Sequence, residues 1–195
     1  GLATGAAGLP LAVLGADCLP VLLWRRDCAG VAAAHAGWRG LVAGVVEAAV
    51  AALGDPARTA AAIGPGIGPC CYPVNAEVRD RFATQFGAGV ISGEAVDLAA
   101  SARAALTRAG LPDAAIATVD ACTRCEAERF YSFRRAGGPC GRHAGVIWNT
   151  EAEGRGATAS SGGHGRRDLC TGCAPPPSPP STPPTGCSAN GSSSP

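Results

Sequence analysis

The 195-residue sequence contains no methionine and no lysine. Because methionine is missing even at position 1, we expect the sequence to begin inside a longer reading frame, with an upstream segment missing. All 16 basic residues are arginine, a compositional bias from which no function follows.

Long hydrophobic runs and an excess of charge of either sign are missing as well. No apolar run reaches the roughly 18 residues that span a bilayer, and no basic segment followed by an apolar one marks an export signal. A net charge of +1 argues against a dedicated nucleic-acid surface. We therefore predict a cytoplasmic protein without membrane or nucleic-acid partners, whose ten cysteines are core residues, ligands or nucleophiles.

One stretch, Ala16–Gly40, organises the chain. It contains the apolar runs LPVLLW and VAAAHA, separated by the charged segment RRDCAG, which predicts a β-hairpin. With a four-residue loop, Cys18 lies directly opposite His35 on one face of the hairpin. Opposed Cβ atoms are roughly 4.5 to 5.5 Å apart, so a thiolate and an imidazole there can share a metal ion or a proton.

The pair Cys18 and His35 has three interpretations. Both are core residues, or they are a thiolate nucleophile and its general base, or they are two ligands of a zinc site that needs a third. Asp17 is expected to point to the other face and to be structural.

A helix is predicted directly after this pair. Apolar residues recur at helical spacing over Leu41–Leu53, after the turn GWRG and before Gly54. The turn presents free N–H groups and a positive helix end, and it carries Arg39. Such a place suits an anion such as phosphate.

The rest of the domain alternates helices, strands and turns, which predicts an α/β (α+β) fold with mixed sheets. The expected elements are a loop over 1–10, strands over 11–14, 59–64 and 115–120, a rigid loop over 64–74, helices after the caps Asn75 and Asp97, and a second hairpin formed by 129–135 and 143–148.

The remaining cysteines and histidines have weaker signals. Cys70-Cys71 is interpreted as packing, because adjacent side chains diverge. Cys122-Thr-Arg-Cys125 has the spacing of a metal knuckle or redox pair, but a zinc site shared with Cys170-Thr-Gly-Cys173 is disfavoured by their separation. His143 and His164 are expected to be exposed.

The composition changes at about Thr150. Residues 150–195 are rich in Gly, Ser and Pro and almost free of large apolar residues, so they cannot offset the entropy of an ordered chain. We predict a domain over 1–149 and a disordered tail over 150–195.

Six motifs occur in one order between Gly15 and Trp148: ADCLPVLL, AAAHAGWRG, AAIGPGIGPCCYPV, D-x-C-T, FYSFRR and GRHAGVIW. Together they resemble the laccase-domain family, whose members are variously named polyphenol oxidase, peptidoglycan editing factor and purine nucleoside phosphorylase. The resemblance implies helices layered around mixed β-sheets, with the N-terminal part of the domain missing here.

The resemblance also implies a zinc-type site of two histidines and one cysteine. Two of these ligands fall on Cys18 and His35, and the family's other histidine lies in an upstream Q-V-H segment that this sequence lacks. The implied substrates are phosphate and the purine nucleosides adenosine, inosine, guanosine and methylthioadenosine, with adenosine deamination as a further activity. Arg39 is the residue that we expect to hold phosphate.

Three alternatives stay open. A Cys-His amidase acting on peptidoglycan precursors would use Cys18 as its nucleophile and no metal. A copper polyphenol oxidase is weaker, because multicopper sites need many histidines and Gly1–Trp148 contains two. A non-enzymatic fragment is the third, since one ligand is missing.

Overall fold

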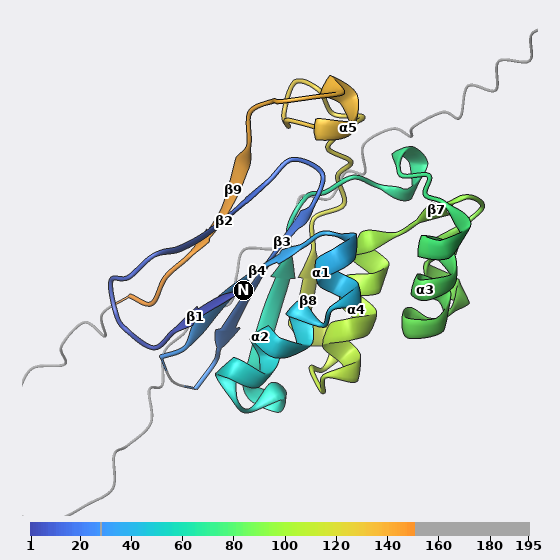
Figure 1. Ribbon diagram of the computed structural model, residues 1–195. Coiled ribbons are helices and arrows are strands. Elements are labelled where there is room, and N and C mark those ends of the chain that lie inside the picture. The colour runs from blue at the N-terminus through green and yellow to red at the C-terminus, as the bar shows by residue number, and fades with distance from the viewer. Residues whose placement is uncertain (28, 151–195) are drawn as a thin grey trace, which may run out of the picture.

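The computed structural model describes residues 1–27 and 29–150, and its centre is a mixed five-stranded sheet (Figure 1). The strand order is β1-β4-β3-β5-β8, with β5 and β8 parallel and the other neighbours antiparallel. The strands are β1 Leu2–Thr4, β3 Leu19–Arg25, β4 Val31–Ala36, β5 Thr59–Ile63 and β8 Ile116–Thr118. Mixed sheets flanked by helices confirm the predicted fold class.

Helices cover one face of this sheet, where the main core lies. They are α1 Trp38–Val42, α2 Val45–Leu53, α3 Ala76–Phe86 and α4 Leu98–Arg108. Val21, Leu23 and Ile63 from the strands and Val46 and Phe82 from the helices are all fully buried in this core. Each buried side chain of this size contributes about 1.5 to 3 kcal/mol to folding.

A second, two-stranded layer covers the opposite face of the sheet. It consists of β2 (Leu11–Gly15) paired antiparallel with β9 (His143–Ile147), and a smaller apolar cluster fills the space between the layers. The predicted second hairpin is therefore wrong. Residues 129–135 form no strand, and the helix α5 (Phe133–Ala136) begins there because the Ser132 side chain accepts the Arg135 N–H.

The predicted helix caps are confirmed, but the predicted helix over 41–53 is wrong as a single element. Asn75 Oδ1 accepts the N–H of Val78 and Asp97 Oδ1 accepts that of Ala100, which fixes the starts of α3 and α4. Gly44 has a φ of 76°, a left-handed conformation that separates α1 from α2.

Two short strand pairings differ from the prediction. The predicted loop over 1–10 is wrong in part, because β1 lies within it and forms an edge strand on β4. A small pair, β6 (Ile91–Ser92) and β7 (Ala95–Val96), was not predicted. The expected tail lies outside the described residues, apart from Thr150.

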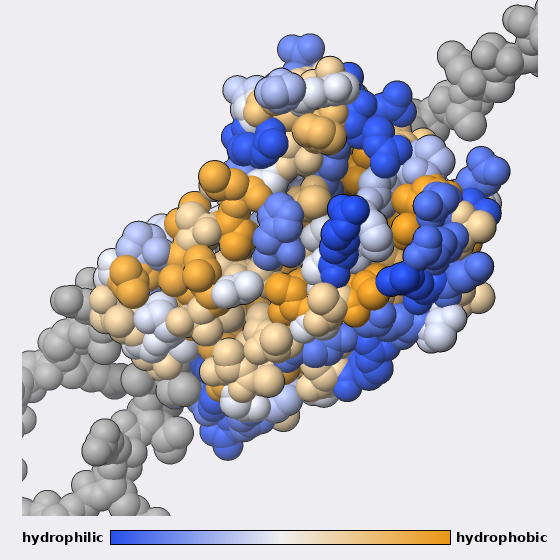
Figure 2. All heavy atoms as spheres, in the orientation of Figure 1, coloured by the Kyte–Doolittle hydropathy of each residue, from blue (hydrophilic) through white to orange (hydrophobic). Residues whose placement is uncertain are grey.

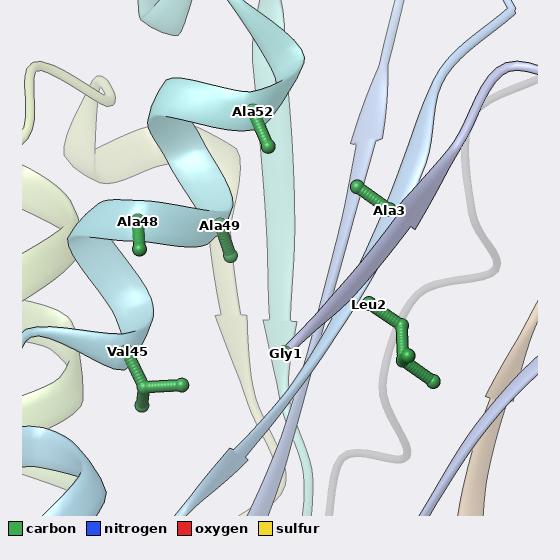
Figure 3. Close-up of a pocket in the computed structure, with 7 residues that line it drawn as sticks. All are labelled: Gly1, Leu2, Ala3, Val45, Ala48, Ala49 and Ala52. Carbon is green, nitrogen blue, oxygen red and sulfur yellow. The ribbon is translucent and has the colours of Figure 1, made fainter.

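An apolar hollow of about 130 Å³ lies between β1 and α2 (Figure 3). Its lining is Gly1, Leu2, Ala3, Val45, Ala48, Ala49 and Ala52. The hollow offers packing space without any ionisable side chain.

Figure 2 shows apolar side chains over β1 and the β2–β9 layer and polar ones over α3. Within residues 1–27 and 29–150, no helix has the length and apolarity needed to cross a membrane.

The loop after β3 gives a stability prediction. Asp27 accepts two hydrogen bonds from the Arg25 guanidinium, at 2.9 and 2.8 Å, and one from Arg58 at 3.2 Å. Hydrogen bonding by Arg25 is the main cause that lowers the Asp27 pKa to about 2. Because the folded-state pKa lies below the unfolded one, the stabilisation is complete above about pH 4 and is lost as the pH falls through about 2.

Asp27→Asn should therefore lower the melting temperature slightly at pH 7, and this difference should shrink as the pH falls towards 2, in thermal unfolding followed by circular dichroism. Asp80→Asn on the exposed side of α3 is the control, and it should have no effect at either pH. An equal loss at both pH values for Asp27→Asn would contradict the ion-pair argument.

Candidate functional site

The β3–β4 register differs by two residues from the predicted one. Pro20, not Cys18, lies opposite His35. The predicted four-residue loop is wrong because the connection runs to Gly30, whose carbonyl accepts the Arg25 N–H at 2.9 Å. A shift of two residues preserves the alternation of faces, so Cys18 and His35 still belong to one side of the hairpin.

Gly37 is where the two side chains converge. A Cβ atom at this position would lie 2.6 Å from Cys18 Sγ and 3.8 Å from His35 Nε2. Both atoms therefore border the same small space, which exists because residue 37 has no side chain. The sequence-predicted thiol and imidazole are brought together in the structure.

The His35 ring is held in one orientation by β2. Its Nδ1 lies 2.8 Å from the carbonyl oxygen of Leu14. A carbonyl only accepts hydrogen bonds, so Nδ1 carries the proton and Nε2 of the neutral ring keeps its lone pair. This is the arrangement of a metal-binding histidine, whose other nitrogen is fixed by a backbone acceptor.

The Cys18 thiol is half-buried, and burial raises its pKa. The neighbouring Asp17 carboxylate raises this pKa further, and Arg142 opposes the rise. Without a bound cation the sulfur therefore stays protonated, which is the opposite of what a cysteine nucleophile needs. A metal ion reverses this effect, because coordination deprotonates a thiol.

Asp17 ties three parts of the chain together beneath this pair. Its carboxylate accepts the Thr123 hydroxyl at 2.8 Å and the Arg134 backbone N–H at 2.7 Å. Asp17 is buried and has a φ of 94°, which is unusual for a residue other than glycine. These contacts fit the structural role expected for Asp17.

Two arginines and a tyrosine lie around the same space. The exposed Arg39 guanidinium is 4.4 Å from the Trp38 ring centroid, and that of Arg134 is 5.0 Å from the Tyr72 ring centroid. Burial raises the Tyr72 pKa, and the positive charges of Arg134 and Arg39 oppose this rise. Because α1 has only five residues, anion attraction here depends on these arginines more than on a helix end.

Sequence reasoning did not identify Tyr72 and Arg134 as site residues. The signal was present in the motifs CCYPV and FYSFRR, but only the fold shows that these loops meet. His143 was predicted to be exposed, which is wrong. Its ring nitrogens are buried and its ring lies 5.6 Å from that of Phe130, and burial lowers its pKa. His164 lies outside the described residues.

A second cluster of chemically active side chains lies in the loops after β5 and β8. The sulfur atoms of Cys70, Cys71, Cys122 and Cys125 all lie within 4.8 Å of one another. The sequence did not predict this group of four. It suggested a joint site of Cys122 and Cys125 only with Cys170-Thr-Gly-Cys173.

Residues 1–150 match the family model described as multi-copper polyphenol oxidoreductase laccase. The chain belongs to this family. Its sequence relatives include purine nucleoside phosphorylase YfiH of Escherichia coli (43% identity over 148 residues, 72% of this chain and 60% of the relative) and purine nucleoside phosphorylase SCO2081 of Streptomyces coelicolor (44%, 74% and 62%). Adenosine deaminase RL5, from an unknown prokaryotic organism, is 37% identical over 72% of this chain and 58% of its own length.

Solved structures of the laccase family agree with the fold. The chain superposes on a YfiH protein of Bacillus licheniformis with a TM-score of 0.71 at 32% identity, covering 76% of this chain and 60% of the other. Protein NMB0706 of Neisseria meningitidis gives 0.70 at 37% identity, covering 76% and 64%. The chain thus spans about 60% of the length of the relatives that it matches.

The close approach at Gly37 gives a test of the site. Gly37→Ala should displace the Cys18 thiol or the Gly37 backbone, because the new Cβ lies 2.6 Å from Sγ. We expect metal affinity to fall about tenfold or more, with a smaller change in melting temperature. Because the clustered cysteines could also take up Zn²⁺, the protein for this test carries Cys122→Ser with and without the Gly37 change, and titration with Zn²⁺ in the presence of a chromogenic chelator measures the affinity.

Gly89→Ala is the matched control, because a Cβ there meets no atom within 4 Å. It should leave the affinity unchanged. Equal affinities for the Gly37→Ala and Gly89→Ala variants would show that Cys18 does not depend on the space at Gly37.

Proposed function

We propose that this chain carries most of the active site of a purine nucleoside phosphorylase that uses a bound metal ion. The observation that carries the proposal is the convergence of Cys18 Sγ and His35 Nε2 over Gly37, with Arg39 and Arg134 nearby. Relatives named purine nucleoside phosphorylase support the reaction class.

The donor set fits zinc. Thiolate sulfur and imidazole nitrogen are the ligands of many zinc sites, and the Leu14 carbonyl leaves His35 Nε2 available. Catalytic zinc sites usually use three protein ligands, and the third would come from the upstream Q-V-H segment that the family resemblance implies. Copper also accepts this donor set and is the alternative metal. When bound, the ion would act as a Lewis acid near the nucleoside.

Phosphate would be held by arginine. The Arg134 guanidinium lies over the Tyr72 ring and that of Arg39 over the Trp38 ring, and both charges act on Tyr72. A guanidinium binds phosphate oxygens through paired N–H donors. A phosphate fixed there would attack C1′ of the ribose and release the purine base. The substrates that we propose are adenosine, inosine, guanosine and methylthioadenosine.

Adenosine deamination is the second activity that we propose, because one relative is named adenosine deaminase. A Cys-His amidase is less well supported, since burial and Asp17 raise the Cys18 pKa. A multicopper oxidase is also weaker, because the described part of the chain contains only two histidines, His35 and His143.

The test of the reaction is release of adenine from adenosine with phosphate, for the chain alone and for the chain extended by an upstream segment that carries the third histidine. Only the extended protein should turn over at an appreciable rate, and a chelator should abolish the activity. Cys18→Ser should lower kcat/KM by about 100-fold or more, because a hydroxyl is a poor zinc ligand. Chelator-insensitive turnover would refute the metal role, and absence of nucleoside turnover in every form would refute the phosphorylase.

The phosphate site has a separate test in steady-state kinetics. Arg39→Ala should raise the KM for phosphate about tenfold and change the KM for adenosine little, because in the proposed site the lost guanidinium binds phosphate and not the nucleoside. Arg81→Ala on α3, which pairs with Glu77, is the control and should behave like the wild type. An equal rise in both KM values would place Arg39 outside the phosphate site.

A further inference from the structure

The parallel pairing of β5 and β8 brings two cysteine-containing loops to one edge of the sheet. Parallel neighbours end at the same edge, so the loops that follow them lie side by side. Gly66 of the first loop bridges to Cys122 of the second, and the Gly66 carbonyl accepts the Thr123 N–H at 2.9 Å. The cysteine pairs of the two loops therefore face each other.

The sulfur atoms have the spacing of a tetrahedral metal site. Cys71 Sγ and Cys125 Sγ are 3.4 Å apart, and Cys70 Sγ and Cys125 Sγ are 3.7 Å apart. Four sulfurs at a Zn–S distance of 2.3 Å in a tetrahedron are ~3.8 Å from one another. All four sulfurs lie within 4.8 Å of each other, so only small shifts are needed to reach this geometry.

Backbone groups are arranged around one of these sulfurs as they are around a metal-bound thiolate. The Gly68 N–H donates to Cys122 Sγ at 3.3 Å.

Cys70, Cys71 and Cys122 are free thiols, whereas Cys125 is disulfide-bonded. We propose that Cys70, Cys71 and Cys122 bind one Zn²⁺ ion, with Cys125 as the fourth ligand once its disulfide has been reduced. A thiol or phosphine reductant supplies two electrons, and with two protons the disulfide becomes two thiols. Binding of the ion then releases one proton from each coordinating thiol.

This site is separate from Cys18 and His35, and its role is to position their surroundings. Cys71 directly precedes Tyr72, and Cys122 directly precedes Thr123, whose hydroxyl donates to Asp17. A metal ion at the cluster would fix both loops. A cavity of about 180 Å³, which borders Cys70 and Cys122, gives the ion a route to the sulfurs.

The experiment is titration of the phosphine-reduced chain with Co²⁺, which gives intense sulfur-to-cobalt charge-transfer absorption when thiolates bind it. The wild type and Cys18→Ser should both bind one equivalent with this absorption. Cys122→Ser should weaken binding about tenfold or more and reduce the absorption, and Cys140→Ser is the control for a free thiol outside the cluster. Zn²⁺ should then displace Co²⁺ and raise the melting temperature.

If Cys122→Ser does not fold, Cys70→Ser replaces it, because Cys70 is exposed. Alkylation with iodoacetamide, mapped by mass spectrometry, needs no variant. Zn²⁺ should protect Cys70, Cys71 and Cys122 and leave Cys140 reactive. The proposal is overturned if the charge-transfer absorption is missing, if it disappears only in Cys18→Ser, or if Zn²⁺ protects no cysteine of the cluster.

Discussion

The antiparallel pairing of β3 with β4 is the constraint on which both faces of the sheet depend. Side chains of β4 alternate, so Ala32, Ala34 and Ala36 enter the core beneath the helices while His35 faces the β2–β9 layer. The small alanines let α2 approach the sheet closely. One register therefore builds the core on one face and directs the imidazole on the other, where the Leu14 carbonyl fixes its tautomer.

Asp17 connects this hairpin to the rest of the domain. A buried carboxylate is costly unless it is hydrogen-bonded, and its two donors come from Thr123 and Arg134, in separate segments. Its left-handed backbone costs about 1 to 3 kcal/mol and persists only because the surroundings hold it. The turn that carries Cys18 is thus ordered by residues more than a hundred positions away.

The parts of the fold that could be predicted are those fixed by neighbouring residues. Asn75 and Asp97 predict the starts of their helices correctly, because a capping side chain bonds to a backbone N–H only three residues away. The pairing of Leu11 with Ile147 could not be predicted, because no local pattern states which distant strand completes a layer. The aromatic alternation in 129–135 favoured a strand, but the Ser132 cap favours a short helix instead.

The candidate site also contains residues that the sequence could predict and others that it could not. Cys18, His35 and Arg39 lie in one stretch, so spacing and family motifs could identify them together, and an error of two residues in register did not change their face. Tyr72 and Arg134 lie in two other segments of the chain, and only the folded structure shows that they are near Cys18. The four clustered cysteines were visible as two pairs after two strands, but their meeting requires those strands to be parallel neighbours.

The two candidate metal sites differ in their ligand atoms, and this difference favours a catalytic role for one and a structural role for the other. The Cys18 and His35 pair combines sulfur with nitrogen and has an exposed imidazole, which would suit a metal site that must admit a substrate. The cysteine cluster would offer sulfur alone once the disulfide of Cys125 is reduced, and a closed tetrahedral set would leave no position for a substrate. A metal in the cluster would therefore act on the reaction only through geometry, by holding Tyr72 and the Thr123 contact to Asp17 beside the open site.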